Sequence, residues 1–347
     1  MNSTTKRAGK VQVAFTSVPM LDAPAIPLPV QKETSGRKYI PYGMDNRYPD
    51  YLLALYSECS TLKAILDGNV NYVMGDDLQI ADSPMSKIKI DELVRETIRD
   101  WYIFGYAFVQ VLRNPFGEVV DLVHLPAEWV RTDKDHQSFW YCENWRKGNA
   151  VIYPAFSPEF RQDSSVLMVG KGRGTYPAPL WSAAVKDVEM ERRVEEFHLN
   201  ELRNNFLSSA IINMNNGKPS NAEKEILERQ LQEKFSGSES AGRIMICFND
   251  NVTNRTTIDR LSSDNFDTRY QALASRTREQ IFVAFRAQSL LFGLTSETRV
   301  GFSTTEFSDL FRLYNKTMIS PVQDMMRLAF GYVMGNPDFL TFTPFTL

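Results

Sequence analysis

The stretch that decides the fold is SLLFGLTSETRVGFSTT, residues 289–305, which separates two segments with strong helical patterning. Apolar residues recur every three or four positions in residues 262–288 before it and in residues 306–333 after it. Gly293 and Gly301 bracket residues of mixed polarity that show no helical period. We therefore expect two helices joined by a loop. A loop of this length tends to be functional or mobile, although a plain surface hairpin of helices fits the pattern as well.

The second of these helices contains an internal proline. Pro321 removes one backbone donor and its ring clashes with the preceding turn, at a cost of roughly 3 kcal/mol in an unadapted helix. The helix is therefore expected to kink near Met318–Ser320. In the first helix, Asp264 is a reasonable N-cap residue.

Composition narrows the class of protein. The 347 residues suggest about two domains. The net charge of −3, from 39 basic and 42 acidic residues, argues against a protein that coats nucleic acid, because such proteins usually carry a basic excess. Cys59, Cys142 and Cys247 form no Cys-x-x-Cys pair, so neither a disulfide framework nor a zinc site is expected. No apolar run is long enough for a membrane span, and no signal peptide is recognisable.

The first half of the chain predicts an α+β domain. Residues 1–38 are rich in Ser, Thr, Lys and Pro and predict an extended arm. The turn-rich segment YIPYGMDNRYP, 39–49, leads into a helix predicted from Asp50 to about Val73 and ended by Gly75. A second amphipathic helix and several short strands with period-two patterning follow. These are Asp91–Ile103, then Ala107–Leu112, Val119–Leu125, Phe139–Asn144, Val151–Tyr153 and Val166–Val169.

The only glycine-rich loop is GKGRGTYPAP, residues 170–179. A phosphate-binding P-loop needs Gly-x-x-x-x-Gly-Lys-Ser/Thr between a strand and a helix, and prolines stand here in place of Lys-Ser/Thr. We therefore interpret it as a flexible turn and expect no nucleotide-driven motor.

A long, heavily charged helix is predicted over Leu180–Phe206. Its apolar positions form only a narrow stripe, so it should pack against similar helices from this chain or from other copies. Residues 207–262 predict a small unit of a strand, a helix and two further strands. These cover Ser209–Met214, Asn221–Phe235, Arg243–Phe248 and Thr256–Leu261.

The order of these elements resembles the portal proteins of tailed bacteriophages, the head-to-tail connectors. The resemblance covers about 39–334 and rests on YGMDNRYPDYL, HLPAEWVRT (124–132), the charged helix, NNFLSSAIINMNNG, LLFGLTSET and YNKTMISPVQDMM. It implies a portal-like α+β subunit in which the segments have distinct roles. These are an N-terminal arm (1–38), a wing (39–179), stem helices (180–206 and 263–287), a clip (207–262), a tunnel loop (288–303), a kinked wing helix (304–334) and a C-terminal tail (335–347). Because so few residues follow Val333, a helical crown is expected to be absent or vestigial.

The resemblance also implies partners and a location. Family members form closed rings, typically dodecamers, at one capsid vertex of the virion, after assembly in the bacterial cytoplasm. Double-stranded DNA would pass through the ring during packaging and ejection. The large terminase, the major capsid protein and tail adaptors would dock on it, and no cofactor, metal or membrane is implied.

The residues that we expect to touch DNA lie in and near the loop, and Arg299 is the obvious phosphate partner. The set is Ser296, Glu297, Thr298, Arg299 and, nearby, Lys316. In the clip, partner contacts are expected at Lys218, Lys224, Arg229 or the loop SGSESAG. No catalytic residue is expected.

Two other functions remain open at this stage. One is an enzyme, a metal-dependent nuclease or nucleotide-binding protein, in which carboxylates would hold magnesium. The candidates are Asp45, Asp76, Asp77 and Asp133, although acidic turn residues are common on any surface. The other is a ring-forming adaptor without a DNA tunnel.

Overall fold

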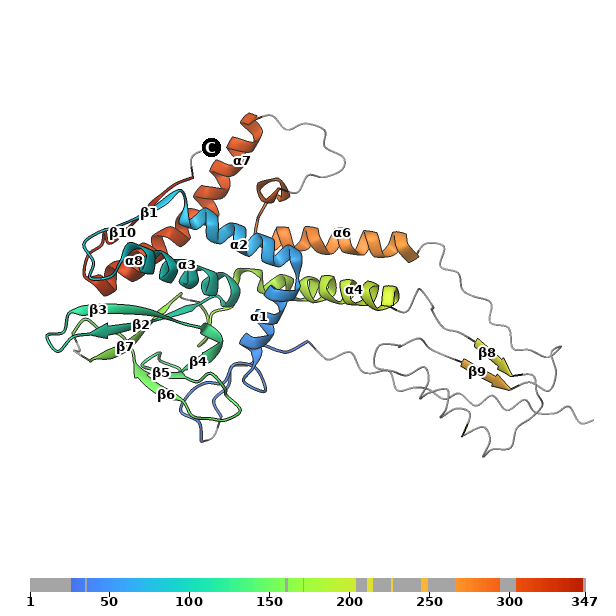
Figure 1. Cartoon of the computed structure of the whole chain (residues 1–347), viewed down its shortest axis with the longest axis horizontal. Coiled ribbons are helices and arrows are strands. Elements are labelled where there is room, and N and C mark those ends of the chain that lie inside the picture. Colours follow the sequence, from blue (N-terminus) through green and yellow to red (C-terminus); the bar gives the residue numbers. More distant parts are fainter. Residues whose placement is uncertain are drawn as a thin grey trace, which may run out of the picture. The chain divides into compact units, whose positions relative to one another are not determined.

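The computed structural model describes residues 26–34, 36–159, 162–170, 172–203, 211–214, 226, 245–248, 266–293 and 304–345. The chain divides into two compact units. The large unit comprises 26–192 and 271–347, and the small unit comprises 1–25 and 193–270. Each unit is described by itself (Figure 1).

The described helices that lie wholly in the large unit are α1 (Tyr48–Glu58), α2 (Ser60–Met74), α3 (Lys87–Phe104), α7 (Thr304–Tyr314) and α8 (Ser320–Met334). Helices α2, α3 and α8 lie on one side of the strands β2, β3 and β7 (Figure 1). Helices α4 (Val185–Arg203) and α6 (Phe266–Ala284) begin in one unit and end in the other. Short helical turns are η1 (Ala127–Trp129), η2 (Leu180–Ala184), η4 (Ser289–Phe292) and η5 (Asn315–Ile319).

The described strands of the large unit form three small antiparallel sheets. Their orders are β3-β2-β7, β4-β5-β6 and β1-β10. The bounds are β1 (Asp77–Ile80), β2 (Ala107–Arg113), β3 (Val119–Leu125), β4 (Val130–Thr132), β5 (Ser138–Tyr141), β6 (Val151–Pro154), β7 (Ser164–Val169) and β10 (Leu340–Thr343). The α+β class and the β2–β3 hairpin are confirmed.

In the small unit, β8 (Ile211–Met214) pairs in parallel with β9 (Met245–Phe248). Both strands were predicted. The helix predicted over 221–235, apart from the helical residue Ile226, and the strand predicted over 256–261 lie outside the described residues.

The single helix predicted from Asp50 to Val73 is wrong, because the chain forms two helices there. Cys59 between α1 and α2 has extended backbone (φ −98°, ψ 112°). Its Sγ lies 3.4 Å from Glu191 Oε2, and the Thr61 hydroxyl donates to Glu191 Oε1 at 2.6 Å. The break thus presents both side chains to α4. The predicted end of the helix at Gly75 is confirmed, with φ at +68°.

The last residues of the chain form a strand that the sequence did not predict. In β10, Leu340 pairs with Ile80 and Thr343 pairs with Asp77. At Gly75 an added Cβ would lie 2.0 Å from the Thr343 oxygen, so only glycine lets the two segments approach this closely.

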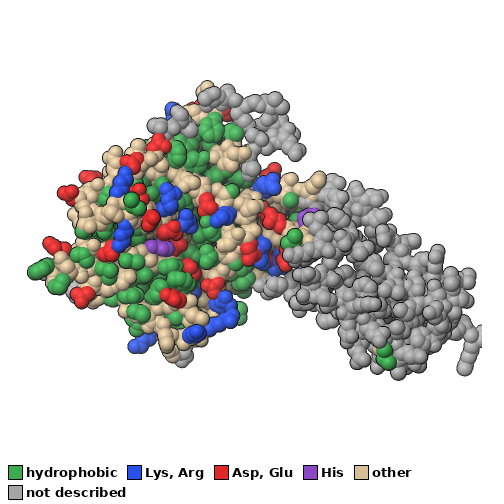
Figure 2. Space-filling view, in the orientation of Figure 1, with side chains coloured by type: hydrophobic (Ala, Val, Ile, Leu, Met, Phe, Trp, Pro, Cys, Tyr) green, Lys and Arg blue, Asp and Glu red, His purple; other side chains and the backbone are tan. Residues whose placement is uncertain are grey.

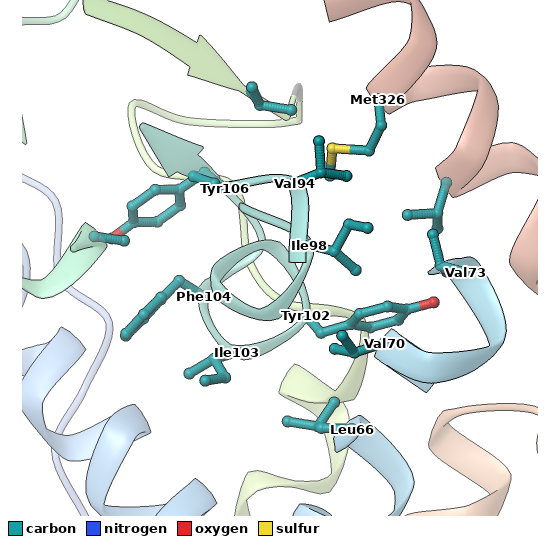
Figure 3. Packing of buried hydrophobic residues seen from close by; sticks show 14 of the residues in the cluster. Leu66, Val70, Val73, Val94, Ile98, Tyr102, Ile103, Phe104, Tyr106 and Met326 are labelled. Atoms are coloured by element: carbon teal, nitrogen blue, oxygen red, sulfur yellow. The ribbon is translucent and has the colours of Figure 1, made fainter. Parts of the chain in front are cut away.

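The core of the large unit lies around α3 (Figure 3). Ile98 and Tyr102 of α3 face the α2 side chains Leu66 and Val70, and Met326 of α8 closes one side (Figure 3). These side chains are all buried. The amphipathic faces read from the sequence therefore meet in one shared apolar layer.

The predicted kink at Pro321 is a π-helical turn. Between α7 and α8, the Ser320 N–H bonds to the Asn315 oxygen, five residues back. Pro321 stands in the first turn of α8, where a missing N–H costs no helical bond. The wider turn accommodates the proline without breaking the helix, which is a common use of π-bulges.

A buried arginine organises the turn that enters α1. Arg131 is fully buried, and its Nε donates to Asn46 Oδ1 at 2.7 Å while Nη2 donates to the Asn46 oxygen at 2.8 Å. Asn46 Oδ1 also accepts the Tyr42 N–H at 3.0 Å. Asn46 has φ at +63°, a conformation that asparagine tolerates better than most residues. The segments YGMDNRYP and VRT are thus joined by one guanidinium.

This arrangement predicts a strong dependence on Asn46. Asn46→Ala leaves the buried guanidinium short of an acceptor and strains the backbone, so we expect a loss of about 3 kcal/mol in a urea unfolding experiment. Asn46→Asp keeps the acceptor oxygen and should lose far less. Equal losses in the two variants would contradict the role given to the Asn46 side chain.

Candidate functional site

The segment that leads into the predicted loop is held on α2. The hydroxyl of Tyr72 donates a hydrogen bond to the Leu291 oxygen in η4. The ring of Tyr72 lies 5.8 Å from that of Phe292 and 5.6 Å from that of Phe311 in α7. One α2 side chain therefore contacts the chain on both sides of residues 294–303, which lie outside the described residues.

Gly68, one turn before Tyr72, makes this docking possible. A Cβ at Gly68 would lie 2.8 Å from the Phe292 ring, so the ring packs directly on the α2 backbone. Gly293 follows with φ at +76°, in the left-handed region that glycine enters without strain. We call Gly68, Tyr72, Leu291 and Phe292 the loop anchor.

The C-terminal segment reaches the same place. Phe345 lies 5.9 Å from the Tyr72 ring, between ring centroids. On the other side, Tyr314 donates a 2.7 Å hydrogen bond to Asn69 Oδ1, and Gln323 Nε2 donates to the Val73 oxygen at 2.8 Å. Helix α2 is thus the common support of η4, of the α7–α8 junction and of the C-terminal strand.

Only one of the predicted DNA-contacting residues can be placed. Lys316 is exposed on the π-helical turn η5. Ser296, Glu297, Thr298 and Arg299 lie outside the described residues, and so do the predicted clip contacts Lys218, Lys224 and Arg229. Their contacts with DNA and with partner proteins stay predictions.

The start of α4 has its own anchor on α1 and α2. Glu189 is buried and its carboxylate accepts hydrogen bonds from Arg192 Nε (3.1 Å) and Nη2 (3.0 Å). Arg192 Nη1 also donates to Glu58 at 2.7 Å. The charges at the start of this helix are thus paired with one another and with α1. Between Glu189 and Arg192, the Met190 sulfur accepts a hydrogen bond from the Thr277 hydroxyl of α6 at 3.7 Å.

The carboxylates proposed for a metal-dependent enzyme serve separate local roles. Asp45 Oδ1 accepts the Arg47 N–H, Asp133 Oδ1 accepts the Gln137 N–H, and Asp77 pairs with Lys87. In the described part of the chain, no group of three or more His, Cys, Asp or Glu side chains could hold a metal ion.

No helix in the described part of the chain is long and apolar enough to cross a bilayer.

One cluster of titratable groups was missed by sequence reasoning, because its members are far apart in the chain. His124 Nε2 of β3 lies 2.8 Å from Asp100 Oδ2 of α3, and the same oxygen accepts the Ala127 N–H at 3.0 Å. Burial lowers the pKa of His124, but the hydrogen bond and charge of Asp100 outweigh this, so the pKa is raised. Burial, and then the charge of Asp100, raise the pKa of Glu128 to about 7.

The loop anchor predicts that the Tyr72 hydroxyl stabilises residues 289–293 locally. Tyr72→Phe keeps every ring contact and removes only the bond to the Leu291 oxygen, which is worth about 1 kcal/mol. Amide hydrogen exchange in 289–293 should become roughly fivefold faster, with little change in global stability. Tyr332→Phe, at an exposed tyrosine of α8, serves as the control. Unchanged exchange in the Tyr72 variant would contradict the anchor.

The titratable cluster predicts a pH dependence of stability. Between the ordinary pKa of 4.5 and the folded pKa of about 7, the folded state holds the Glu128 proton more tightly than the unfolded state does. Stability from this group therefore falls as the pH rises through that window, and the raised pKa of His124 acts in the same direction.

Glu128→Gln should remove this slope. Thermal melting is expected to show a gain of up to about 3 kcal/mol at pH 8 and almost none at pH 4.5. The charges of Asp100 and Asp50 raise the pKa of Glu128, and the charge of His124 lowers it. Glu92→Gln, at an exposed glutamate of α3, should leave the pH profile unchanged. A gain that is equal at both pH values would contradict the assignment.

Comparison with known proteins places the fold. The sequence model of the phage portal protein family matches residues 79–334. The neck of a native GTA particle, computed with C12 symmetry, is similar with a TM-score of 0.53 and 12% identity, over 85% of this chain and 84% of that one.

A protein of the virion of a native gene transfer agent particle gives a TM-score of 0.52 and 12% identity, over 86% and 84% of the two chains. At this identity the structural likenesses show the fold alone. No curated protein sequence matches the chain. Because the family model matches well over half of the sequence, the chain belongs to the phage portal protein family.

Proposed function

We propose that this chain is the subunit of a closed ring at one vertex of a phage capsid, through which double-stranded DNA is packaged and ejected. The family match over residues 79–334 carries the proposal. The C12 symmetry of the similar neck structure supports a ring of twelve copies. The location would be the portal vertex of the virion, after assembly in the bacterial cytoplasm, and we expect no catalytic activity.

Within such a ring we assign the segments as the resemblance implies. Residues 39–179 and 304–334 form the wing, 180–206 and 263–287 the stem, and 207–262 the clip. The boundary between the two compact units runs through α4 and α6, so neither helix belongs wholly to one unit. This supports the assignment of both helices to a separate stem. The large terminase and tail adaptors would dock on the clip, with Lys218, Lys224 and Arg229 as candidate contacts, and the major capsid protein would surround the wing.

The surfaces of α4 and α6 support association between copies. Met190 and Leu199 of α4 are 37% and 48% exposed, and Val283 of α6 is 66% exposed. In a monomer these exposed apolar side chains contribute little stability, because they are not fully buried. In a ring, heterologous contacts between neighbouring subunits would cover them and close on themselves.

The loop 288–303 would line the tunnel. Its first residues are held on α2 by Tyr72, which bonds to the Leu291 oxygen and packs against Phe292. We assign DNA contact to Ser296, Glu297, Thr298 and Arg299. Lys316 is a further candidate, although the eleven residues of α7 separate it from the end of the loop. One arginine beside one glutamate would touch phosphates without holding them tightly, which suits DNA that must slide.

Negative-stain images of the purified protein test the ring directly. We expect closed rings with a central hole, and a mass close to twelve subunits by mass photometry. A protein that stays monomeric over a wide concentration range would overturn the proposal. Closed rings that lack a hole wide enough for a duplex would favour an adaptor without a DNA tunnel.

The role of the loop needs a change that spares its anchor. Residues 294–300 are replaced by the same number of Gly and Ser residues, while Phe292 and Gly293 are kept. Rings should form normally, and DNA packaging or retention should fall at least tenfold in particles assembled with the variant. If the replacement abolishes ring assembly instead, the loop is structural and the assignment is wrong.

A further inference from the structure

Lysines and arginines gather on the loops at one end of the large unit. They come from segments that precede α1, that join β4 to β5 and β5 to β6, and that follow β7. The residues are Lys32, Arg37, Lys38, Lys134, Arg146, Lys147 and Arg173, and all are exposed. We call them the basic loop surface. Figure 2 shows Lys and Arg side chains collected along the lower edge of the unit, where Figure 1 places these loops.

Contacts between the loops show that these cations lie together. The Lys134 ammonium is 3.9 Å from Glu33, next to Lys32. An added Cβ at Gly174, beside Arg173, would lie 2.9 Å from the Gln31 side chain.

A second set of contacts joins the remaining cations to the same surface. The guanidinium of Arg37 lies 5.9 Å from the centre of the Tyr39 ring, and that ring is 4.9 Å from the ring of Trp145, which precedes Arg146 and Lys147. The Ile40 N–H bonds to the Thr132 oxygen at 2.9 Å, which links the two groups.

The loops are held in place by Tyr176, from the glycine-rich stretch that we predicted to be a flexible turn. Its side chain is fully buried. Its hydroxyl donates to the Ile40 oxygen at 2.6 Å and accepts the Thr132 N–H at 3.0 Å. Its backbone N–H and oxygen both bond the Gln31 amide, at 2.9 and 2.8 Å. One tyrosine thus ties three of the loops together, so the surface is preformed.

Most of these cations have no ion-pair partner in the described part of the chain, Lys134 with Glu33 being the exception. The acidic side chains on the same loops are fewer, and Asp133 already accepts the Gln137 N–H at 2.8 Å. The net charge of the whole chain is −3, so it does not reveal that positive charge is in excess on this surface.

We propose that the basic loop surface binds the phosphate backbone of double-stranded DNA, apart from the loop 288–303. Long cationic side chains on separate loops, projecting from a fixed base, suit a ligand with regularly spaced charges more than one with a defined shape. Such binding would be independent of sequence and strongly dependent on salt. The proposal extends the proposed function but does not require that DNA also pass through a ring.

The test measures binding of a fluorescent 30-base-pair duplex to the purified full-length protein by anisotropy, over a range of NaCl concentrations. In Arg146→Gln/Lys147→Gln the slope of log K against log[NaCl] should become shallower by about 1.8, since each phosphate contact contributes roughly 0.9. By the same estimate, the affinity for the duplex at 0.1 M NaCl should fall by roughly tenfold to a hundredfold. An independent variant, Lys38→Gln/Arg173→Gln, should act alike.

Lys87→Gln/Lys89→Gln is the matched control, because it removes the same charge from two exposed lysines that pair with Asp77 and Asp121. An equal loss in this control, or unchanged binding in the surface variants, would overturn the proposal. So would polyglutamate that binds the surface as tightly as DNA does, since the partner would then be an acidic protein. If the protein forms rings but the surface variants bind DNA as tightly as the unchanged protein does, only the proposed DNA-binding surface is wrong. If the protein stays monomeric and the surface variants lose DNA binding, only the proposed ring is wrong.

Discussion

The structure depends first on a buried guanidinium that, among the described residues, bonds to no carboxylate. Arg131 donates to oxygens of the backbone and of Asn46, and its guanidinium lies 5.0 Å from the centre of the Trp145 ring. These bonds fix the turn before α1. Helices α1 and α2 then support both α4 and the turn η4. Glu191 of α4 bonds to Thr61 at the start of α2, and η4 bonds to Tyr72 near its end. A chain of short-range contacts thus connects the entry turn to the base of the proposed stem and to the base of the proposed tunnel loop.

Local patterning predicted most helices and strands, because periodicity depends on neighbours that are close in sequence. It predicted a kink near Pro321 but not its form. The π-helical turn contains one extra residue, so it shifts the faces of the residues that follow, and Met326 and Phe330 are buried there. Local patterning missed what depends on distant partners. Asn46 meets Arg131 across 85 positions, and Gln31 meets Tyr176 across 145. The division of one predicted helix at Cys59 follows from Glu191, which no pattern within α1 or α2 contains.

The same reasoning explains which parts of the candidate site could be found. The glycines that bracket the loop are a local signal, and Gly293 does end the anchored turn with a positive φ. Gly68 carries no such signal, because within a helical pattern it reads only as a weak helix former. Its role appears when Phe292 is seen to pack on it. The aromatic residues around Tyr72 read as ordinary core positions, and they are core positions that also hold the base of a loop.

Charge is the property that the sequence average describes least well. A net charge near zero suits the proposed tunnel, in which DNA would have to slide, and it gives no reason to expect a surface that binds DNA. Weak contact with DNA in the proposed tunnel and binding of DNA on the basic loop surface concern different places on the subunit. The net charge of the whole chain cannot distinguish these two places. Tyr176 bonds to Gln31, 145 positions earlier in the sequence, and so brings their two loops together. Cations that look scattered along the chain become neighbours there, and a local field of one sign forms without any basic run in the sequence.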